Sequence, residues 1–325
     1  MKLDTKKLGA KISEYAVFIA LVLLVAAMVI FADGFATSSN LLNLLRQAAF
    51  NGLIAFGMTL VILSDGIDLS VGSVFALAAI ICAELVMSGM NAALAVLIAL
   101  VAGTALGLLS GFLVAKCRLQ AFIATLITMT AYRGLAYIIT DGKPISRLAS
   151  SIASESGSFF FKALGKGNVL LFETIKLPIP ALILLAAFLA VWFILTKTTF
   201  GRRIYATGSN AKCAKLVGVD TAKIKMACYG ISGFLAALAG LLMCSRLNSA
   251  QPTFGDGYEL DAIAATALGG TSMSGGRGKI TGTIAGVLII AVLNNGLNIM
   301  DVSSYYQQVI KAVVILVAVL SDRKR

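Results

Sequence analysis

The sequence contains no histidine, and only 15 of its 325 residues are acidic. Catalytic triads that use histidine as the general base, and zinc sites built from cysteine and histidine, are therefore excluded. The five cysteines are scattered and form no CxxC pair, so a disulfide framework is not expected either. We therefore expect no catalytic residue, no metal site and no cofactor in this chain.

Charged residues are scarce, at 13% of the chain, whereas apolar residues make up 59%. An average soluble domain contains about 25% charged residues. A soluble protein of this length could not bury so much apolar surface, so the sequence predicts an all-α polytopic membrane protein. The net charge of +12 would suit nucleic acid, but the basic residues lie at the ends of apolar segments. We interpret them as topology signals and expect no nucleic-acid partner.

Long apolar runs divide the chain into membrane-spanning segments. A spanning helix needs about 20 apolar residues, and by this measure ten segments are predicted to cross the membrane. They are residues 14–32, 44–64, 70–88, 92–114, 120–140, 178–196, 225–247, 258–274, 280–299 and 305–321. Paired glycines at positions 269–270 and 275–276 suggest that the eighth helix is short or broken. The whole chain, residues 1–325, is expected to form a single transmembrane domain.

The distribution of Lys and Arg predicts the orientation. With the N-terminus inside, the cytoplasmic segments hold 18 of the 27 basic residues and the outside segments hold six. Both termini are therefore expected in the cytoplasm. The largest outside segment is a periplasmic loop at about residues 141–177. Its aromatic triplet, residues 159–161, suits either the membrane interface or a short helix on which a delivery protein rests.

The longest basic interruption is the cytoplasmic loop at residues 197–225, with seven Lys or Arg and one acid. Ser209 or Asn210 can cap a short helix there. Its apolar face would consist of Ala211, Ala214, Leu216 and Val217. One interpretation is a helix on the membrane surface that meets a cytoplasmic partner, and the other is a solvated loop that only fixes topology.

The turn between the second and third apolar segments carries two acids, Asp65 and Asp68. Gly66 can end the preceding helix, and Asp68 or Ser70 can cap the following one. Alternatively, the turn is an irregular break below the membrane surface, where a carboxylate costs about 2.5–3.5 kcal/mol on insertion scales and needs polar partners. The residues of the turn leave both interpretations open.

Glycines recur at four-residue spacing in two of the predicted spans, which allows helix backbones to approach closely. They are Gly103, Gly107 and Gly111 in the fourth span and Gly282 and Gly286 in the ninth. The two strings around them are similar, and the two spans run in opposite directions. This suggests an inverted repeat of four helices, about residues 44–140 against 225–321.

Several sequence blocks resemble one family. They are GMTLVIL at 57–63, GIDLSVGS at 66–73, QAFIATL at 120–126, GYELDAIAA at 257–265, LGGTS at 268–272, LNNGLN at 293–298 and VSSYYQ at 302–307. Together they resemble the membrane-spanning permease of bacterial ABC sugar importers, and specifically the ribose branch. No such block falls in the predicted periplasmic loop.

The resemblance implies a permease subunit that imports a monosaccharide, with ribose expected, across the bacterial cytoplasmic membrane. It also implies a lipid-embedded homodimer, a separate ATP-binding subunit and a periplasmic sugar-binding protein as partners. No Walker motif is present, so the chain itself is not expected to hydrolyse ATP. The residues expected to couple to the ATPase are Ser209, Asn210, Ala211, Ala214 and Gly218. The candidates for the translocation pathway are Asp68, Ser70, Asn294, Asn295 and Asn298.

A stand-alone secondary transporter driven by an ion gradient is the alternative. Such a protein needs ionisable relay residues within its spans. The candidates are Glu84, Arg133 and Lys311.

Overall fold

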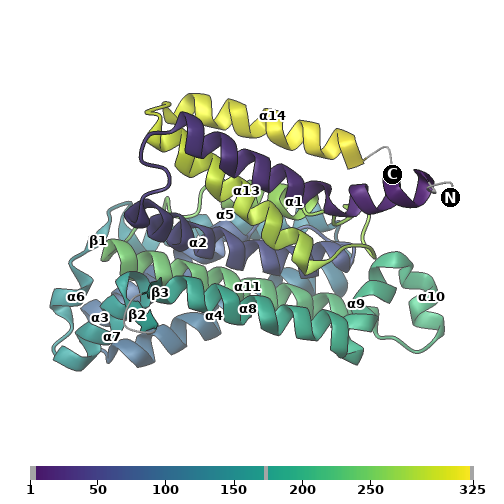
Figure 1. Ribbon diagram of the computed structural model, residues 1–325. Coiled ribbons are helices and arrows are strands. Elements are labelled where there is room, and N and C mark those ends of the chain that lie inside the picture. Colours follow the sequence, from purple (N-terminus) through teal and green to yellow (C-terminus); the bar gives the residue numbers. More distant parts are fainter. Residues whose placement is uncertain (1–4, 172–174, 323–325) are drawn as a thin grey trace.

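The computed structural model describes residues 5–171 and 175–322 and consists mainly of helices (Figure 1). The helices are α1 (Thr5–Phe31), α2 (Ser38–Leu63), α3 (Val71–Met87), α4 (Ala92–Ala115), α5 (Ala121–Thr140), α6 (Leu148–Ser151), α7 (Glu155–Lys166), α8 (Ile179–Lys197), α9 (Thr199–Ser209), α10 (Ala211–Leu216), α11 (Thr221–Leu247), α12 (Tyr258–Leu268), α13 (Ile280–Ile299) and α14 (Ser304–Asp322). The short strands are β1 (Ile145–Ser146), β2 (Asn168–Leu171), β3 (Ile175–Pro178) and β4 (Ser249–Ala250).

Each of the ten predicted segments overlaps one of these helices, namely α1–α5, α8 or α11–α14. Among the described residues, six helices are long and apolar enough to cross a membrane: α2, α4, α5, α8, α11 and α13. The predicted segment 258–274 extends too far, because α12 ends at Leu268, and the helix is short as the paired glycines suggested. Gly269 caps it and Gly270 follows with a φ of +78°, a backbone conformation that glycine adopts without strain.

Helix α11 lies in the centre of the bundle and packs against α2, α3 and α4. Most of the spanning portions of α2, α11 and α13 are buried, whereas less than a third of those of α4, α5 and α8 is buried. Helices α1, α13 and α14 lie on one side of the bundle, above α2 and α11 in the view of Figure 1. The core is therefore built from central helices, and the outer helices present aliphatic surface to the surroundings.

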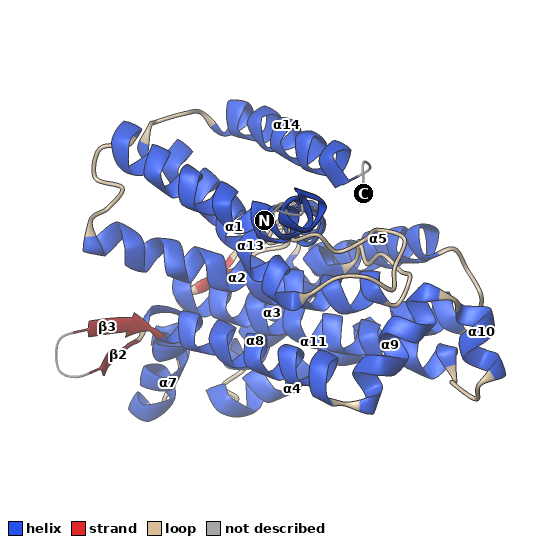
Figure 2. Ribbon diagram, turned by 45° about the vertical axis from the view of Figure 1, so that its right-hand side comes forward, coloured by secondary structure: helices blue, strands red, loops and turns tan. Residues whose placement is uncertain are grey.

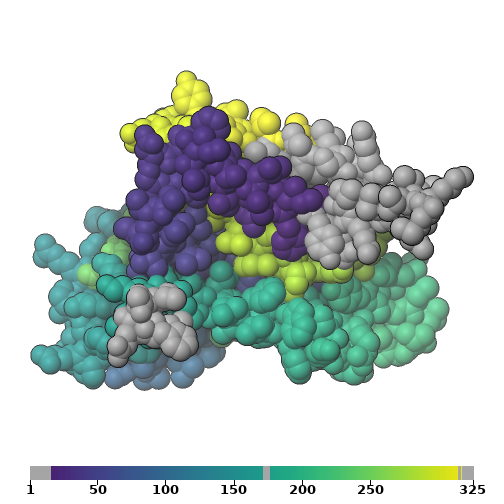
Figure 3. All heavy atoms as spheres, in the orientation of Figure 1, coloured from purple at the N-terminus to yellow at the C-terminus, as the bar shows by residue number. Residues whose placement is uncertain are grey.

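The two large loops lie at opposite ends of the bundle. The elements α6, α7 and the β2–β3 hairpin lie at one end, and α10 lies at the other, in both Figure 1 and Figure 2. The space-filling view in Figure 3 shows α9 and α10, in green, extending to the edge of the molecule. The chain ends 1–4 and 323–325, and residues 172–174 of the predicted periplasmic loop, lie outside the described residues.

Helix α7 provides the aromatic triplet of the predicted periplasmic loop. Phe161 is buried, and its carbonyl oxygen accepts a hydrogen bond from the Ser245 hydroxyl of α11. Phe159 is exposed and Phe160 less so. The loop is further anchored where β1 pairs with β4 in an antiparallel register that places Ile145 opposite Ala250. It is therefore packed on the end of α11, with only part of the triplet available at the surface.

The glycine row of α4 lies directly against the backbone of α11. A Cβ added at Gly107 would lie 2.3 Å from the backbone oxygen of Tyr229, and one at Gly233 would lie 2.3 Å from that of Gly103. The close approach predicted for the row is confirmed. Gly282 and Gly286 of α13 likewise lie against the backbone of Gly269 and Ala265.

We expect Gly107→Val to lower the stability of the protein by about 1–3 kcal/mol, the usual cost of overpacking. The valine side chain would force α4 away from α11. The matched control is Gly134→Val, because a Cβ at Gly134 has no atom within 4 Å. Thermal unfolding of both variants in detergent checks this prediction, and equal melting temperatures would contradict it.

Candidate functional site

The turn Ser64–Ser70, here called the Asp68 turn, runs along α11 between the end of α2 and the start of α3. Three side chains of α11 hold it, and we call them the α11 ladder. They are Lys225, Tyr229 and Ser232. Their spacing of four and three residues places them on one face of the helix. The turn therefore runs along one face of α11 and is bound to that face at three positions.

Each rung of the α11 ladder contacts a different residue of the turn. The Lys225 ammonium donates to the Asp65 backbone oxygen at 2.9 Å and pairs with its carboxylate at 3.2 Å. The Tyr229 hydroxyl donates to the backbone oxygen of Ile67 at 2.9 Å. The Ser232 hydroxyl donates to Asp68 Oδ2 at 3.1 Å.

The carboxylate of Asp68 is buried, with 1% of the residue exposed. Its Oδ1 accepts hydrogen bonds from the Ser70 backbone N–H at 3.0 Å and the Ser70 hydroxyl at 2.6 Å. With the Ser232 bond, three neutral donors serve this one acid. Burying a carboxylate is expensive unless it is hydrogen-bonded, so this set of donors explains how the acid is accommodated.

The depth of Asp68 follows from its partner on α11. Ser232 lies eleven residues after Thr221 and fifteen before Leu247, which at 1.5 Å per residue is about 16 Å from one end of the helix and about 22 Å from the other. Asp68 is therefore near the middle of a membrane-spanning helix, and α3 begins there. This geometry favours the irregular break over a capped turn at the membrane surface.

A group of hydroxyls continues from the Asp68 turn into α4 and α5. The Ser70 hydroxyl lies 3.3 Å from that of Ser110, which donates to Thr128 at 3.0 Å. The hydroxyl of Tyr132 donates to the Leu106 backbone oxygen at 2.9 Å. The break is thus surrounded by polar side chains of α4, α5 and α11 in an otherwise aliphatic interior.

The three asparagines of α13 have separate environments. Asn295 forms a reciprocal amide pair with Asn40 of α2, with both hydrogen bonds 2.8 Å long. Asn298 is exposed and accepts a hydrogen bond from Gln307 at 2.8 Å. The Oδ1 atom of Asn294 is buried without a hydrogen-bond partner in the part of the chain that the structure describes. The three therefore do not gather at Asp68, and Asn295 has an interhelical structural contact.

Sequence reasoning missed an ion pair between α12 and α14. Lys311 Nζ lies 3.2 and 3.3 Å from the two carboxylate oxygens of Asp261, and their side chains are 22% and 10% exposed. Arg133, another ionisable residue of the spans, donates to the carbonyl oxygens of Pro252 and Phe254 and pairs with Asp256 at 2.7 Å. Arg133 and Lys311 are thus both engaged in contacts between elements of the fold.

The basic loop predicted a short helix starting at Ser209 or Asn210, which corresponds to α10, whereas α9 was not predicted. Together, α9 and α10 are here called the surface segment, Thr199–Leu216. Asn210 caps α10, because its side-chain oxygen accepts the N–H groups of Lys212 and Cys213 at 3.0 Å each. Ser209 is the last residue of α9. Asp220 caps α11 and accepts the Lys223 backbone N–H at 3.1 Å, which lowers the pKa of its carboxyl below the usual value.

The apolar residues of α10 divide between two sides. Ala214 is 3% exposed and faces the protein, so its side chain is not at the surface. Leu216 and Val217 are 87% and 80% exposed. Gly218 follows with a φ of +82°, and a Cβ there would meet nothing within 4 Å. The outward apolar surface of the segment therefore consists of Leu216 and Val217, not of Ala214.

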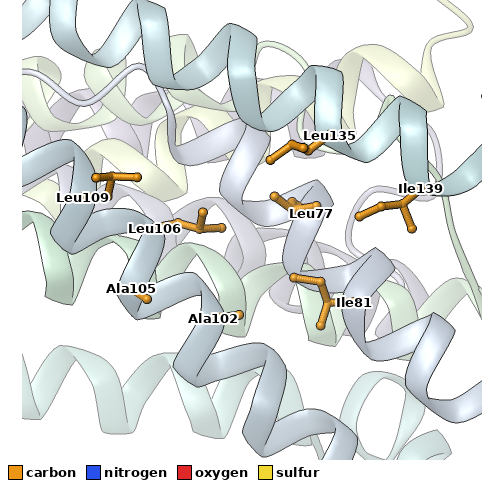
Figure 4. Close-up of a pocket in the computed structure, with 8 residues that line it drawn as sticks. All are labelled: Leu77, Ile81, Ala102, Ala105, Leu106, Leu109, Leu135 and Ile139. Atoms are coloured by element: carbon orange, nitrogen blue, oxygen red, sulfur yellow. The ribbon is translucent and has the colours of Figure 1, made fainter.

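A cavity of about 400 Å³ lies between α3, α4 and α5. Eight aliphatic side chains line it, as Figure 4 shows: Leu77, Ile81, Ala102, Ala105, Leu106, Leu109, Leu135 and Ile139. Binding sites for polar ligands need a few well-placed polar groups. This lining offers no side-chain hydrogen bond, so the cavity does not suit a sugar.

Comparisons with known proteins cover nearly the whole chain. Residues 40–319 match the family model described as branched-chain amino acid transport system / permease component. The chain is 49% identical over 308 residues to the ribose import permease protein RbsC of Bacillus subtilis, covering 95% of this chain and 92% of that protein. It is 48% identical over 324 residues to RbsC of Haemophilus influenzae, covering 99% and 97%.

A more distant relative is named for a different sugar, xylose. The xylose transport system permease protein XylH of Escherichia coli K12 is 35% identical over 368 aligned positions, which cover 97% of this chain and 93% of that protein. No solved structure matches the chain.

Proposed function

The chain belongs to the branched-chain amino acid transport system / permease component family, and we propose that it is the membrane-spanning subunit of a ribose importer. It is a permease of the ABC transporter type and a multi-pass protein of the bacterial inner membrane, so its work is transport and not catalysis. Ribose is proposed as the substrate because the chain is 48–49% identical to ribose import permeases along almost its full length, compared with 35% to the xylose permease.

Our proposal includes ten transmembrane helices in one domain, residues 1–325, with both termini in the cytoplasm. The visible ends of α1 and α14 lie at the same end of the bundle as α10 (Figure 1), which supports placing that end inside. The loop at about residues 141–177 then faces the periplasm, and the loop at 197–225 faces the cytoplasm.

The proposed inverted repeat pairs α2–α5 with α11–α14. Under this pairing the contact of α4 with α11 corresponds to that of α13 with α2, and both are extensive. Both α3 and α12 also follow an irregular stretch, residues 64–70 and 251–257. The first stretch is held by the α11 ladder, and the second by Arg133. The matching helix contacts and the irregular stretches before α3 and α12 support the repeat beyond the short similar strings.

The surface segment is proposed to bind the ATP-binding subunit. Leu216 and Val217 would enter an apolar groove of that subunit, while Lys212 and Lys215 favour an acidic rim. Asn210 and Gly218 define the start and end of α10, and Ser209, Ala211 and Ala214 seat it on the permease. ATP-driven closure of the partner would thus act on a well-anchored element.

The other proposed partners are a second copy of this chain, surrounding lipid, and a sugar-binding protein at the periplasmic end. The pathway candidates Asp68, Ser70 and Asn295 are buried here, and Asn294 is half-buried. In this arrangement Asp68 and Ser70 stabilise the break between α2 and α3. We propose that the translocation pathway for the sugar opens beside this break when the subunit changes state. A ligand can shift such an equilibrium only by its differential affinity for the two states.

The alternative, a secondary transporter, would need mobile charges within the spans. Arg133 and Lys311 are bound to acids and carbonyl groups of other elements, which suits a structural role. The relatives named as import permeases support the ABC importer over this alternative.

Reconstitution tests the proposed function. The permease is placed in vesicles with its ATP-binding subunit and the ribose-binding protein, and uptake of labelled ribose is measured. We expect uptake that requires ATP and all three components, with xylose transported poorly. Uphill uptake by the permease alone would refute the importer and support a secondary transporter.

A further inference from the structure

The surface segment contacts the Asp68 turn through an unusually close backbone contact, which we call the glycine junction. It consists of Gly208 of α9, Leu63 at the end of α2 and Gly276 in the loop before α13. A Cβ added at Gly208 would lie 1.9 Å from the Leu63 backbone oxygen and 2.6 Å from the Gly276 nitrogen. The Gly276 N–H donates to that same Leu63 oxygen at 3.0 Å. No side chain separates these three backbones.

Neighbouring residues extend the glycine junction on both sides. The Ser209 hydroxyl donates to the Gly276 backbone oxygen at 3.4 Å, and the Tyr205 hydroxyl donates to that of Gly278 at 2.9 Å. A Cβ added at Gly275 would lie 3.1 Å from the Cα of Asp65. The surface segment, the loop before α13 and the start of the Asp68 turn therefore meet at one point.

The α11 ladder continues this connection into the membrane. Lys225 holds the turn at the level of the junction, and its side chain is 17% exposed. Tyr229 and Ser232 hold it at successively deeper levels, ending at the Asp68 carboxylate. Helix α11 also begins five residues after the end of α10. The turn is thus attached to the surface segment through two routes, the junction and the ladder.

The hydroxyl of Thr207, one residue before Gly208, is fully buried and has no hydrogen-bond partner in the described chain. A buried polar group without a partner is unfavourable. A displacement of the junction that gave this hydroxyl an acceptor would remove that cost.

We propose that the glycine junction and the α11 ladder are positioning elements that fix the Asp68 turn to the surface segment. A movement of the surface segment then displaces the turn and the Asp68 carboxylate, about 10 Å deeper than Lys225 along α11. This inference rests on the proposed function, because it assigns the route by which the ATP-binding subunit acts on the break in the helix.

The test measures the ratio of ribose transported to ATP hydrolysed by the complete importer in vesicles. Lys225→Met removes the outermost rung, and Tyr229→Phe removes one hydroxyl without changing the ring. Gly208→Ala places a methyl group in the junction. The matched controls are Lys223→Met, whose ammonium forms an exposed pair with Asp220, and Gly134→Ala, which has open space around its Cβ.

We expect the three test variants to bind the ATP-binding subunit and hydrolyse ATP while the transport ratio falls about two- to thirtyfold, the range for residues that modulate coupling. Both controls should keep the ratio of the unmodified protein. An unchanged ratio in Lys225→Met and Tyr229→Phe would overturn the inference, even where Gly208→Ala fails to assemble. If the unmodified complex does not transport ribose, the proposed function fails instead, so the two failures are distinguishable.

Discussion

Replacement of Asp68 by alanine is expected to abolish ribose uptake by the assembled importer, by at least about 100-fold. The change removes the acceptor of three hydrogen bonds that hold the break between α2 and α3. Hydrogen bonds to charged groups contribute about 1.5–3 kcal/mol each, and the Ser70 N–H and Ser232 hydroxyl would lose their partner. The turn would then lose the deepest of its three attachments to α11.

Uptake and membrane insertion are measured together for Asp68→Ala and Asp68→Asn. The amide keeps one acceptor oxygen for Ser70, so we expect the asparagine variant to retain more activity than the alanine variant. Equal amounts of both proteins in the membrane would show that the loss is functional. Normal uptake by Asp68→Ala would show that the break does not depend on this carboxylate.

Introducing aspartate at both Leu216 and Val217 is expected to reduce ATP-driven uptake to the background level. Two nearly fully exposed apolar side chains at the end of α10 suit a contact with another protein. Charges there would be desolvated in the contact without a partner. Because neither side chain is buried, the permease itself should insert and fold normally.

Co-purification with the ATP-binding subunit checks this second prediction directly. The matched control replaces Leu216 with methionine and Val217 with isoleucine, which keeps the surface apolar, and should keep both binding and uptake. Retained binding by the double aspartate variant would place the contact elsewhere. Ala214→Glu cannot serve for this test, since a charge at a 3% exposed position would disturb α10 itself.

The positions of the helices could be predicted from the sequence because apolar length is a local property. The four-residue glycine spacing of α4 likewise predicted a close contact that the structure contains. The length of α12 was overestimated, because the predicted segment continued through Gly269 and Gly270 to residue 274, whereas the helix ends at Leu268. The paired glycines indicate this end, but hydropathy averaged along the chain does not.

The candidate site was less predictable because its contacts join distant parts of the chain. Asp68 was identified, but its depth depends on Ser232, which is 164 residues away. The pairing of Asn295 with Asn40 spans 255 residues. In α10, a helix of only six residues is too short for its pattern to define which apolar side chains face inward. Packing on the rest of the protein determines which side chain is buried, and here it is that of Ala214.

The ion pair between α12 and α14 has a consequence for biosynthesis. Asp261 is made 50 residues before Lys311, so for a time the nascent chain carries an acid in its interior that has no lysine to bind. A charge left unpaired inside a folded protein is strongly unfavourable. The last helix therefore supplies the partner of this acid, and chains that stop before residue 304 would leave Asp261 without its ion pair.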